Sequence, residues 1–412
     1  MSRPTPQSMP RPIGTTEFII LMALMTSLSA LSTDAMLPAL PIIGSDLGVS
    51  NINDTQLVLS ALFLGLAIGQ MFYGPISDST GRKPMVYVGF GLFVIGCLMS
   101  IYAENFTIML IGRLLQGFGI AGPRTVSVAI IRDQYSGNDM ARIMSYIMAV
   151  FIIGPVVAPS IGQGVLIFAH WQMIFTLLMS LSIFVCIWFT MRQSETLPVS
   201  ARSIFSFFRI KSAVIEVCKN RQSLGYTLVG SMVFGSLIGY LTSAQQIFQV
   251  RFELGNMFPV YFGIMAMSVG VASVFNGKLV HRFGMFMLSL RAMQLMILVS
   301  ILTLAIIAYM EIQMNQNLPF WIFMIWGLVA FLCLGFLFGN VNALAMEPLG
   351  HIAGTGASVI GSLTTFISLI LGTLIGQAYD GTTIPMIAGF AVLGVIGLLI
   401  MVWVESKQTE TK

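Results

Sequence analysis

Long apolar runs separated by short polar stretches repeat along this 412-residue sequence. A helix needs roughly 20 apolar residues to cross a bilayer. Backbone groups in lipid must be hydrogen-bonded within their own segment, so runs of this length predict helices. We expect twelve such spans, at 17–43, 55–77, 85–103, 107–131, 143–168, 172–191, 224–249, 258–277, 286–310, 319–343, 356–379 and 385–404.

The composition supports a membrane protein and excludes a soluble enzyme. Hydrophobic residues make up 56% of the chain and charged residues 9%, whereas soluble proteins carry about 25% charged residues. The sequence contains no basic stripe with interleaved aromatic residues, so it does not predict a nucleic-acid partner. The run that begins at Phe18 is too long for the apolar part of a signal peptide, so we expect it to remain as the first span.

The positions of Lys and Arg predict the orientation of the spans. If both termini are cytoplasmic, 17 of the 20 Lys and Arg residues fall in inner loops and tails. Such an excess of basic residues marks the cytoplasmic side. Only Arg251 then falls in an outer loop, and Arg113 and Arg124 lie inside the span 107–131.

The second half of the chain repeats features of the first. Two corresponding loops share one glycine spacing, with Gly74 and Gly81 in the first and Gly277 and Gly284 in the second. Duplicated halves are typical of transporters. We expect an all-α integral membrane fold of two pseudo-symmetric six-helix halves, 1–191 and 224–412, joined by the cytoplasmic central loop 192–223.

Several segments resemble motifs of the major facilitator superfamily. The loop Gly74–Lys83 resembles its GxxxDxxGR(R/K) motif, and the segment from Arg113 through Gln116 and Gly117 to Gly119 resembles its RxxQGxG motif. The segments 32–41 and 345–356 are similar to the bicyclomycin/chloramphenicol-resistance (Bcr/CflA) branch of drug:proton antiporters. The span 143–168 contains a segment that resembles a GPxxGP-type antiporter motif, with Gly154, Pro155, Pro159 and Gly162.

Asp34 is the most informative single residue. It lies well inside the first span and is followed by Pro38 and Pro41, which can loosen a helix. An ionisable group in hydrocarbon costs several kcal/mol unless it faces a cavity or a partner. We therefore expect Asp34 to carry protons, with a structural hydrogen-bonding role as the alternative. Arg113 is its expected counterpart in proton coupling, either by direct pairing or through a polar relay at Gln116, and the alternative is an Arg that holds spans together.

Two other groups of residues have expected roles. The residues of the loop between the second and third spans are expected to act in gating. Glycine permits a tight turn there, and the charges can cap helix ends or pair across the halves. These loop residues are Gly74, Asp78, Gly81, Arg82 and Lys83. Ser79 stands where the family often has an Arg, so part of that charge network is expected to be missing. The motif around Pro155 predicts a bent helix that packs closely on its neighbours.

Polar side chains inside spans are the candidates for contact with the cargo. They are Gln116, Tyr240, Gln245, Asn340 and Asn342, each with helix-to-helix hydrogen bonding as the alternative. The four cysteines and three histidines show no metal-binding spacing, so we expect no metal. No nucleotide-binding motif is present, so we expect no cofactor and a proton gradient as the energy source.

The resemblance implies a proton-coupled multidrug exporter of a bacterial inner membrane. Its partners would be small amphipathic substrates, protons and the lipid bilayer, and the chain is expected to be a monomer. Export of a siderophore or metabolite by the same mechanism remains an alternative. A proton-coupled nutrient symporter is a second alternative. A membrane-embedded enzyme is disfavoured, because the sequence shows no catalytic constellation.

Overall fold

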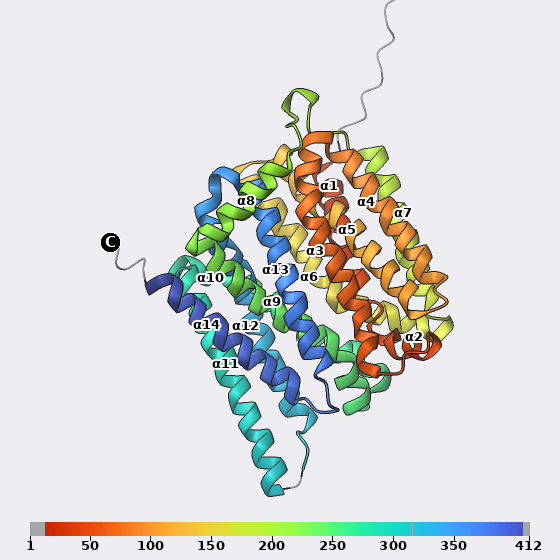
Figure 1. Ribbon diagram of the computed structural model, residues 1–412, viewed down its shortest axis with the longest axis vertical. Coiled ribbons are helices and arrows are strands. Elements are labelled where there is room, and N and C mark those ends of the chain that lie inside the picture. The colour runs from red at the N-terminus through yellow and green to blue at the C-terminus, as the bar shows by residue number, and fades with distance from the viewer. Residues whose placement is uncertain (1–12, 315, 407–412) are drawn as a thin grey trace, which may run out of the picture.

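The computed structural model describes residues 13–314 and 316–406, which form a bundle of long helices (Figure 1). The first half comprises α1 (Thr15–Asp34), α2 (Leu40–Asp46), α3 (Leu57–Thr80), α4 (Arg82–Ile101), α5 (Phe106–Gln134), α6 (Gly137–Phe168) and α7 (Gln172–Arg192). The second half comprises α9 (Arg221–Gln245), α10 (Phe258–Phe283), α11 (Met285–Tyr309), α12 (Phe320–Met346), α13 (Ala353–Gln377) and α14 (Ile384–Ser406). Short 3-10 turns (η1, Leu37–Ala39; η2, Ile52–Gln56; η3, Val199–Ala201; η5, Gly255–Met257; η7, Glu347–Ile352) and π-helical turns (η4, Gln246–Arg251; η6, Met310–Met314) connect them.

The described residues contain the twelve crossings that the sequence predicts. Eleven stretches are long and apolar enough to span a membrane. The longest, Phe320–Gln377, holds two helices, α12 and α13, which are joined by η7. The all-α fold class is therefore confirmed. Several helices continue past the predicted ends of their apolar runs, most clearly α6 and α10.

Figure 1 shows that α8 (Phe207–Lys219) lies across one end of the bundle, here called the α8 end. The opposite end, here called the far end, carries α2. The sequence predicted only a polar loop over 192–223. The structure instead places an amphipathic helix there, because Ile210, Ala213 and Val217 recur at helical spacing and are buried. Residues 1–12 and 407–412, which include four of the basic residues used for the predicted orientation, lie outside the described part of the chain.

The two halves share the same turn geometry at equivalent positions. Gly81 links α3 to α4 with a φ of 109°, and Gly284 links α10 to α11 with a φ of 77°. Residues with a side chain rarely adopt this region, so both turns require glycine. Helix packing repeats as well, because α3 and α4 flank α5 just as α10 and α11 flank α12. Contacts between the halves run mainly from α3 to α13 and from α6 to α10.

Close backbone contact at glycines positions the helices of the first half. A Cβ atom on Gly117 of α5 would overlap the carbonyl of Leu62 on α3, and one on Gly162 of α6 would overlap the carbonyl of Ala35. Gly154 lies against Ala30 in the same way, with 3.3 Å between its ideal Cβ position and the Ala30 Cβ. Gly154 and Gly162 thus lie close to α1 and to the turn that follows it. The helix α6 is continuous through Pro155 and Pro159.

We expect Gly162→Ala to destabilise the fold, because its methyl group has no room beside the Ala35 carbonyl. Overpacking of this kind typically costs about 1–3 kcal/mol. The matched control is Gly164→Ala, since nothing lies within 4 Å of that Cβ position, and alanine is the better helix former. Thermal unfolding of the purified variants in detergent should show a lower Tm for Gly162→Ala only. Equal Tm values for the two variants would contradict the packing described here.

Candidate transport site

Asp34 lies at the point where the first crossing is interrupted. The helix α1 ends at this residue, and the chain continues through η1 into α2, with Pro38 and Pro41 in the first turns of those two segments. The side chain of Asp34 is buried, with 3% of its surface exposed. Its Oδ1 atom has no hydrogen-bond partner among the described residues. Such a carboxyl is free to bind a proton or a ligand group.

Arg113 holds the last turn of α1 in place. Its guanidinium, which has no exposed surface, donates to the carbonyl of Ser32 on α1 at 2.8 Å and to that of Val58 on α3 at 3.3 Å. It also donates to Oε1 of Gln116 at 2.6 Å. None of the described ion pairs joins Arg113 to Asp34. The polar contact with Gln116, one of the two arrangements that the sequence left open, is present.

The five predicted pathway residues differ in their surroundings. Gln116 donates to the carbonyl of Gly96 and to Oγ of Ser100, so it cross-links α5 to α4. Asn340 exchanges two hydrogen bonds with Asn276 of α10, at 2.8 and 3.0 Å. These contacts match the helix-to-helix alternative. Asn342, in contrast, is exposed near the α8 end of α12.

Tyr240 and Gln245, in the last two turns of α9, have buried polar atoms without a described partner. The hydroxyl of Tyr240 and Oε1 of Gln245 are buried without a described hydrogen-bond partner. The Tyr240 ring packs on Phe331 at 4.6 Å and on Phe262 at 5.4 Å between ring centroids. Tyr240 is also close enough to Asp34 for the two groups to interact electrostatically. A residue of each half therefore contributes a polar group to one buried region.

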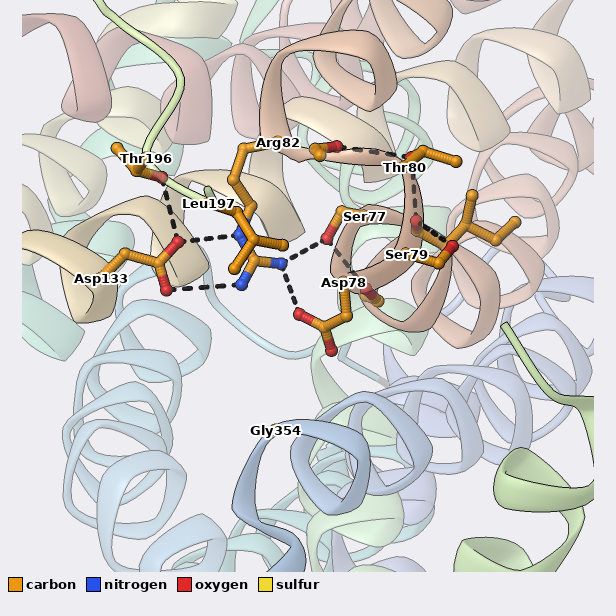
Figure 2. Close-up of polar contacts among 12 residues, drawn as sticks. Ser77, Asp78, Ser79, Thr80, Arg82, Asp133, Thr196, Leu197 and Gly354 are labelled. Atoms are coloured by element: carbon orange, nitrogen blue, oxygen red, sulfur yellow. Dashed lines mark hydrogen bonds and ion pairs between the residues drawn. The ribbon is translucent and has the colours of Figure 1, made fainter. Parts of the chain in front are cut away.

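The predicted gating loop contains a network centred on Arg82 (Figure 2). The guanidinium bonds to Asp78 on α3 and to Asp133 on α5, with 2.8 Å between Nε and the Asp133 carboxylate. Both pairs lie within the first half. Asp78 points toward the second half, where Gly354 lies at the start of α13. Ser79 only donates to the backbone carbonyl of Ile76.

The central segment is tied to this network by Glu195. Its carboxylate accepts hydrogen bonds from the backbone N–H groups of Arg82 and Lys83, both at 3.0 Å, and from Leu197. The Lys83 ammonium donates to the carbonyls of Thr190 and Gln193 at the end of α7, where a cation is favourable. Partial burial opposes ionisation of Glu195, but these N–H groups outweigh it and lower its pKa.

Hydrogen bonds between the halves cluster at the far end. The amide of Asn53 donates to the carbonyls of Gln377 (3.1 Å) and Tyr379 (2.9 Å) and accepts from Gln246 (2.7 Å). Gln377 donates back to the Asn53 carbonyl at 3.0 Å. We call these four residues the Asn53 latch. Ser60 and Thr373 add a hydroxyl pair at 2.8 Å, so the far end is closed.

Sequence reasoning missed several of these residues. Asp133 and Glu195 lie outside the recognised motifs, although the charged pair at 132–133 follows directly on an apolar run. Asn53 and Gln246 are ordinary polar residues near span ends, and no sequence signal distinguishes them. Among residues 13–314 and 316–406, no group of three or more His, Cys, Asp or Glu residues lies close enough to hold a metal ion.

A family model described as Major Facilitator Superfamily matches residues 22–373. The chain belongs to the major facilitator superfamily. The chain is accordingly a membrane transporter rather than an enzyme.

Relatives with assigned names agree with the motif resemblance. The chain is 28% identical to an uncharacterized MFS-type transporter, YdgK of Bacillus subtilis, over 92% of this chain and 93% of that protein. It is 28% identical to the bicyclomycin resistance protein homolog of Haemophilus influenzae, over 96% and 98%. It is 26% identical to the multidrug resistance protein MdtL of Shigella flexneri, over 84% of each. The resemblance to the Bcr/CflA branch is thereby confirmed.

The fold also matches a solved transporter. The crystal structure of the human organic anion transporter MFSD10 (TETRAN) aligns with a TM-score of 0.67, covering 94% of this chain and 100% of that one. The sequence identity is 15%. This likeness establishes the superfamily fold.

We expect the central segment to detach from α4 at low pH. The pKa of Glu195 is lowered in the folded protein. The ionised carboxylate therefore holds the segment fully in place above the ordinary glutamate pKa of about 4.3, and this stabilisation is lost as pH falls through the lowered pKa. Fluorescence anisotropy of a probe at Val199→Cys, in a background with the four native cysteines replaced, should stay constant from pH 7 down to about 4.3 and fall only below that pH. Glu195→Gln should give low anisotropy throughout.

The matched control for this measurement is Glu216→Gln in α8, whose carboxylate pairs with His351 rather than with α4. This variant should keep the pH profile of the parent protein. An unchanged profile in Glu195→Gln would show that Glu195 does not anchor the segment.

We expect Asn53→Ala to open the far end. The variant loses three hydrogen bonds made by the Asn53 side chain, each worth about 0.5–1.5 kcal/mol. Spin labels at Ser50→Cys and Met257→Cys, in a background without native cysteines, should report a longer distance population by pulsed electron paramagnetic resonance. Asn105→Ala is the control, because that side chain caps α5 within one half. An unchanged distance distribution in Asn53→Ala would refute the latch.

Proposed function

We propose that this chain is a proton-coupled multidrug exporter, which exchanges protons for small amphipathic compounds by alternating access. The observation that carries this proposal is the buried carboxyl of Asp34, which lies at the break in the first crossing and whose Oδ1 has no described hydrogen-bond partner. An ionisable group at such a position is the usual mark of a proton relay. The proton gradient supplies the energy, and no cofactor is required.

The distribution of charge supports an inward orientation of the α8 end. The basic residues Arg82, Lys83, Arg202 and Arg209 gather in the segments at this end, and such segments are usually cytoplasmic. We propose that this end faces the cytoplasm of a bacterium, with both termini inside. The closed Asn53 latch then seals the outer side, as required when cargo enters from the cytoplasm.

The transport cycle follows from the charge of Asp34. With the far end open, the carboxyl takes a proton from the outside. The neutral carboxyl binds cargo less well, so the empty carrier returns toward the cytoplasm. There the proton leaves, and the charged carboxylate accepts hydrogen bonds from donor groups of the next cargo molecule. Arg113 acts as a positioning residue in this scheme, because it fixes the turn of α1 that carries Asp34.

The relatives support drugs as the cargo. Two of them are named for bicyclomycin resistance and multidrug resistance. Apolar side chains that can repack suit varied amphipathic compounds, and the aromatic cluster around Tyr240 is a candidate for such repacking. A siderophore or metabolite as cargo would use the same mechanism and would be distinguished by the response to added drugs.

We expect Asp34→Asn to abolish drug-dependent proton release, because asparagine cannot bind a proton there. Everted membrane vesicles are acidified inside by respiration, and a fluorescent probe follows the lumenal pH. Adding a phenicol or a quinolone should make the lumen more alkaline in vesicles with the parent protein. Vesicles with Asp34→Asn should show no response.

The matched control is Asp380→Asn, which changes an exposed carboxylate in a loop at the far end. It should respond like the parent protein. A full response from Asp34→Asn would remove Asp34 from the mechanism. Acidification of the lumen on drug addition would indicate symport and would overturn the proposal.

A further inference from the structure

Arg124 is a second charged residue inside a crossing, and the transport cycle described above does not use it. It lies ten residues before Gln134, the last residue of α5, which corresponds to about 15 Å at 1.5 Å per residue. Its side chain is half-buried. A charged group at this depth is costly and usually faces a polar pathway or a partner.

The last turns of α5 reach the other half at Arg132. Arg124, Val128 and Arg132 follow at four-residue spacing and therefore share one side of the helix. Arg132 lies beside α13, because a Cβ on Gly354 would be 2.9 Å from its Nη1 atom. Arg132 thus lies next to the second half at the α8 end, and Arg124 lies about two turns further into the bundle.

Arg124 has no acidic partner among the described ion pairs. Those pairs join Arg82 to Asp78 and Asp133, Arg192 to Glu17, and His351 to Glu216. The guanidinium lies over the ring of Phe151 on α6, with 6.0 Å between its central carbon and the ring centroid. A contact with a ring face satisfies part of the charge, but it leaves the N–H donors available.

We propose that Arg124 binds the anionic group of the cargo, and that the transported compounds include amphipathic carboxylates. A guanidinium presents two parallel N–H groups that match a carboxylate, whereas the Phe151 ring contacts the apolar body next to it. The inference rests on the proposed export function, since the ligand is the exported cargo. It adds a charge preference that Asp34 and Tyr240 do not supply.

The test measures binding rather than transport. A fluorescent quinolone carboxylic acid and its ethyl ester are titrated against purified protein in neutral detergent at pH 7.5, with no proton gradient. The parent protein should bind the acid about tenfold more tightly than the ester. Arg124→Gln should bind both equally, and Arg124→Lys should keep part of the preference, because lysine retains the charge without the paired donors.

Arg209→Gln is the matched control, since it removes an exposed arginine of α8 and should leave the preference unchanged. A single symmetric peak in size-exclusion chromatography identifies folded variants. Equal binding of acid and ester by the parent protein, no binding of the acid, or a preference that survives in Arg124→Gln would each overturn the proposal.

This result is separable from the proposed export function. Loss of the acid preference in Arg124→Gln leaves Asp34-dependent proton exchange with the ester intact in everted vesicles. Conversely, failure of proton exchange does not alter a binding preference measured without a gradient.

Discussion

The structure depends on a buried arginine that joins three helices through their backbones. Arg113 donates to carbonyls of α1 and α3 and, through Gln116, connects α5 to α4. Removing a guanidinium from water costs several kcal/mol, so it is tolerated only where its N–H groups are satisfied. Glycines at the helix crossings allow the backbones to come close enough, as at Gly117. The outcome is a rigid support for the turn of α1 that ends at Asp34.

Much of this arrangement could be predicted from residue type and spacing. Apolar runs predicted the twelve crossings, because lipid leaves the backbone no alternative to helices. The paired glycine loops predicted duplicated halves, and Gly81 and Gly284 indeed adopt the same left-handed turn. The depth of Asp34 in its apolar run predicted a buried carboxyl, and it is buried. In each case a local physical requirement restricts which residue types can stand at a position, so the sequence pattern reveals it.

The remaining features depend on three-dimensional contacts. Asn53 ties the two halves together at the far end by bonding to Gln377, the last residue of α13, and to Tyr379 just beyond it, both more than 300 positions away, and no local pattern identifies such partners. The helix α8 lies within a polar segment, and its few apolar residues are buried only because they pack against α9 and α13. The contact of Arg124 with Phe151 on α6 likewise follows from the rotation of α5 in the folded bundle, which no local pattern specifies.

The central claim is that drug and protons move in opposite directions through this chain. Purified protein reconstituted in liposomes tests it directly, with a fluorescent quinolone at equal concentration on both sides and an imposed pH difference. We predict that the drug accumulates on the acidic side and that reversing the pH difference reverses the accumulation. Protein-free liposomes correct for passive redistribution of the drug. Accumulation on the alkaline side, or none beyond that of protein-free liposomes, would contradict the account.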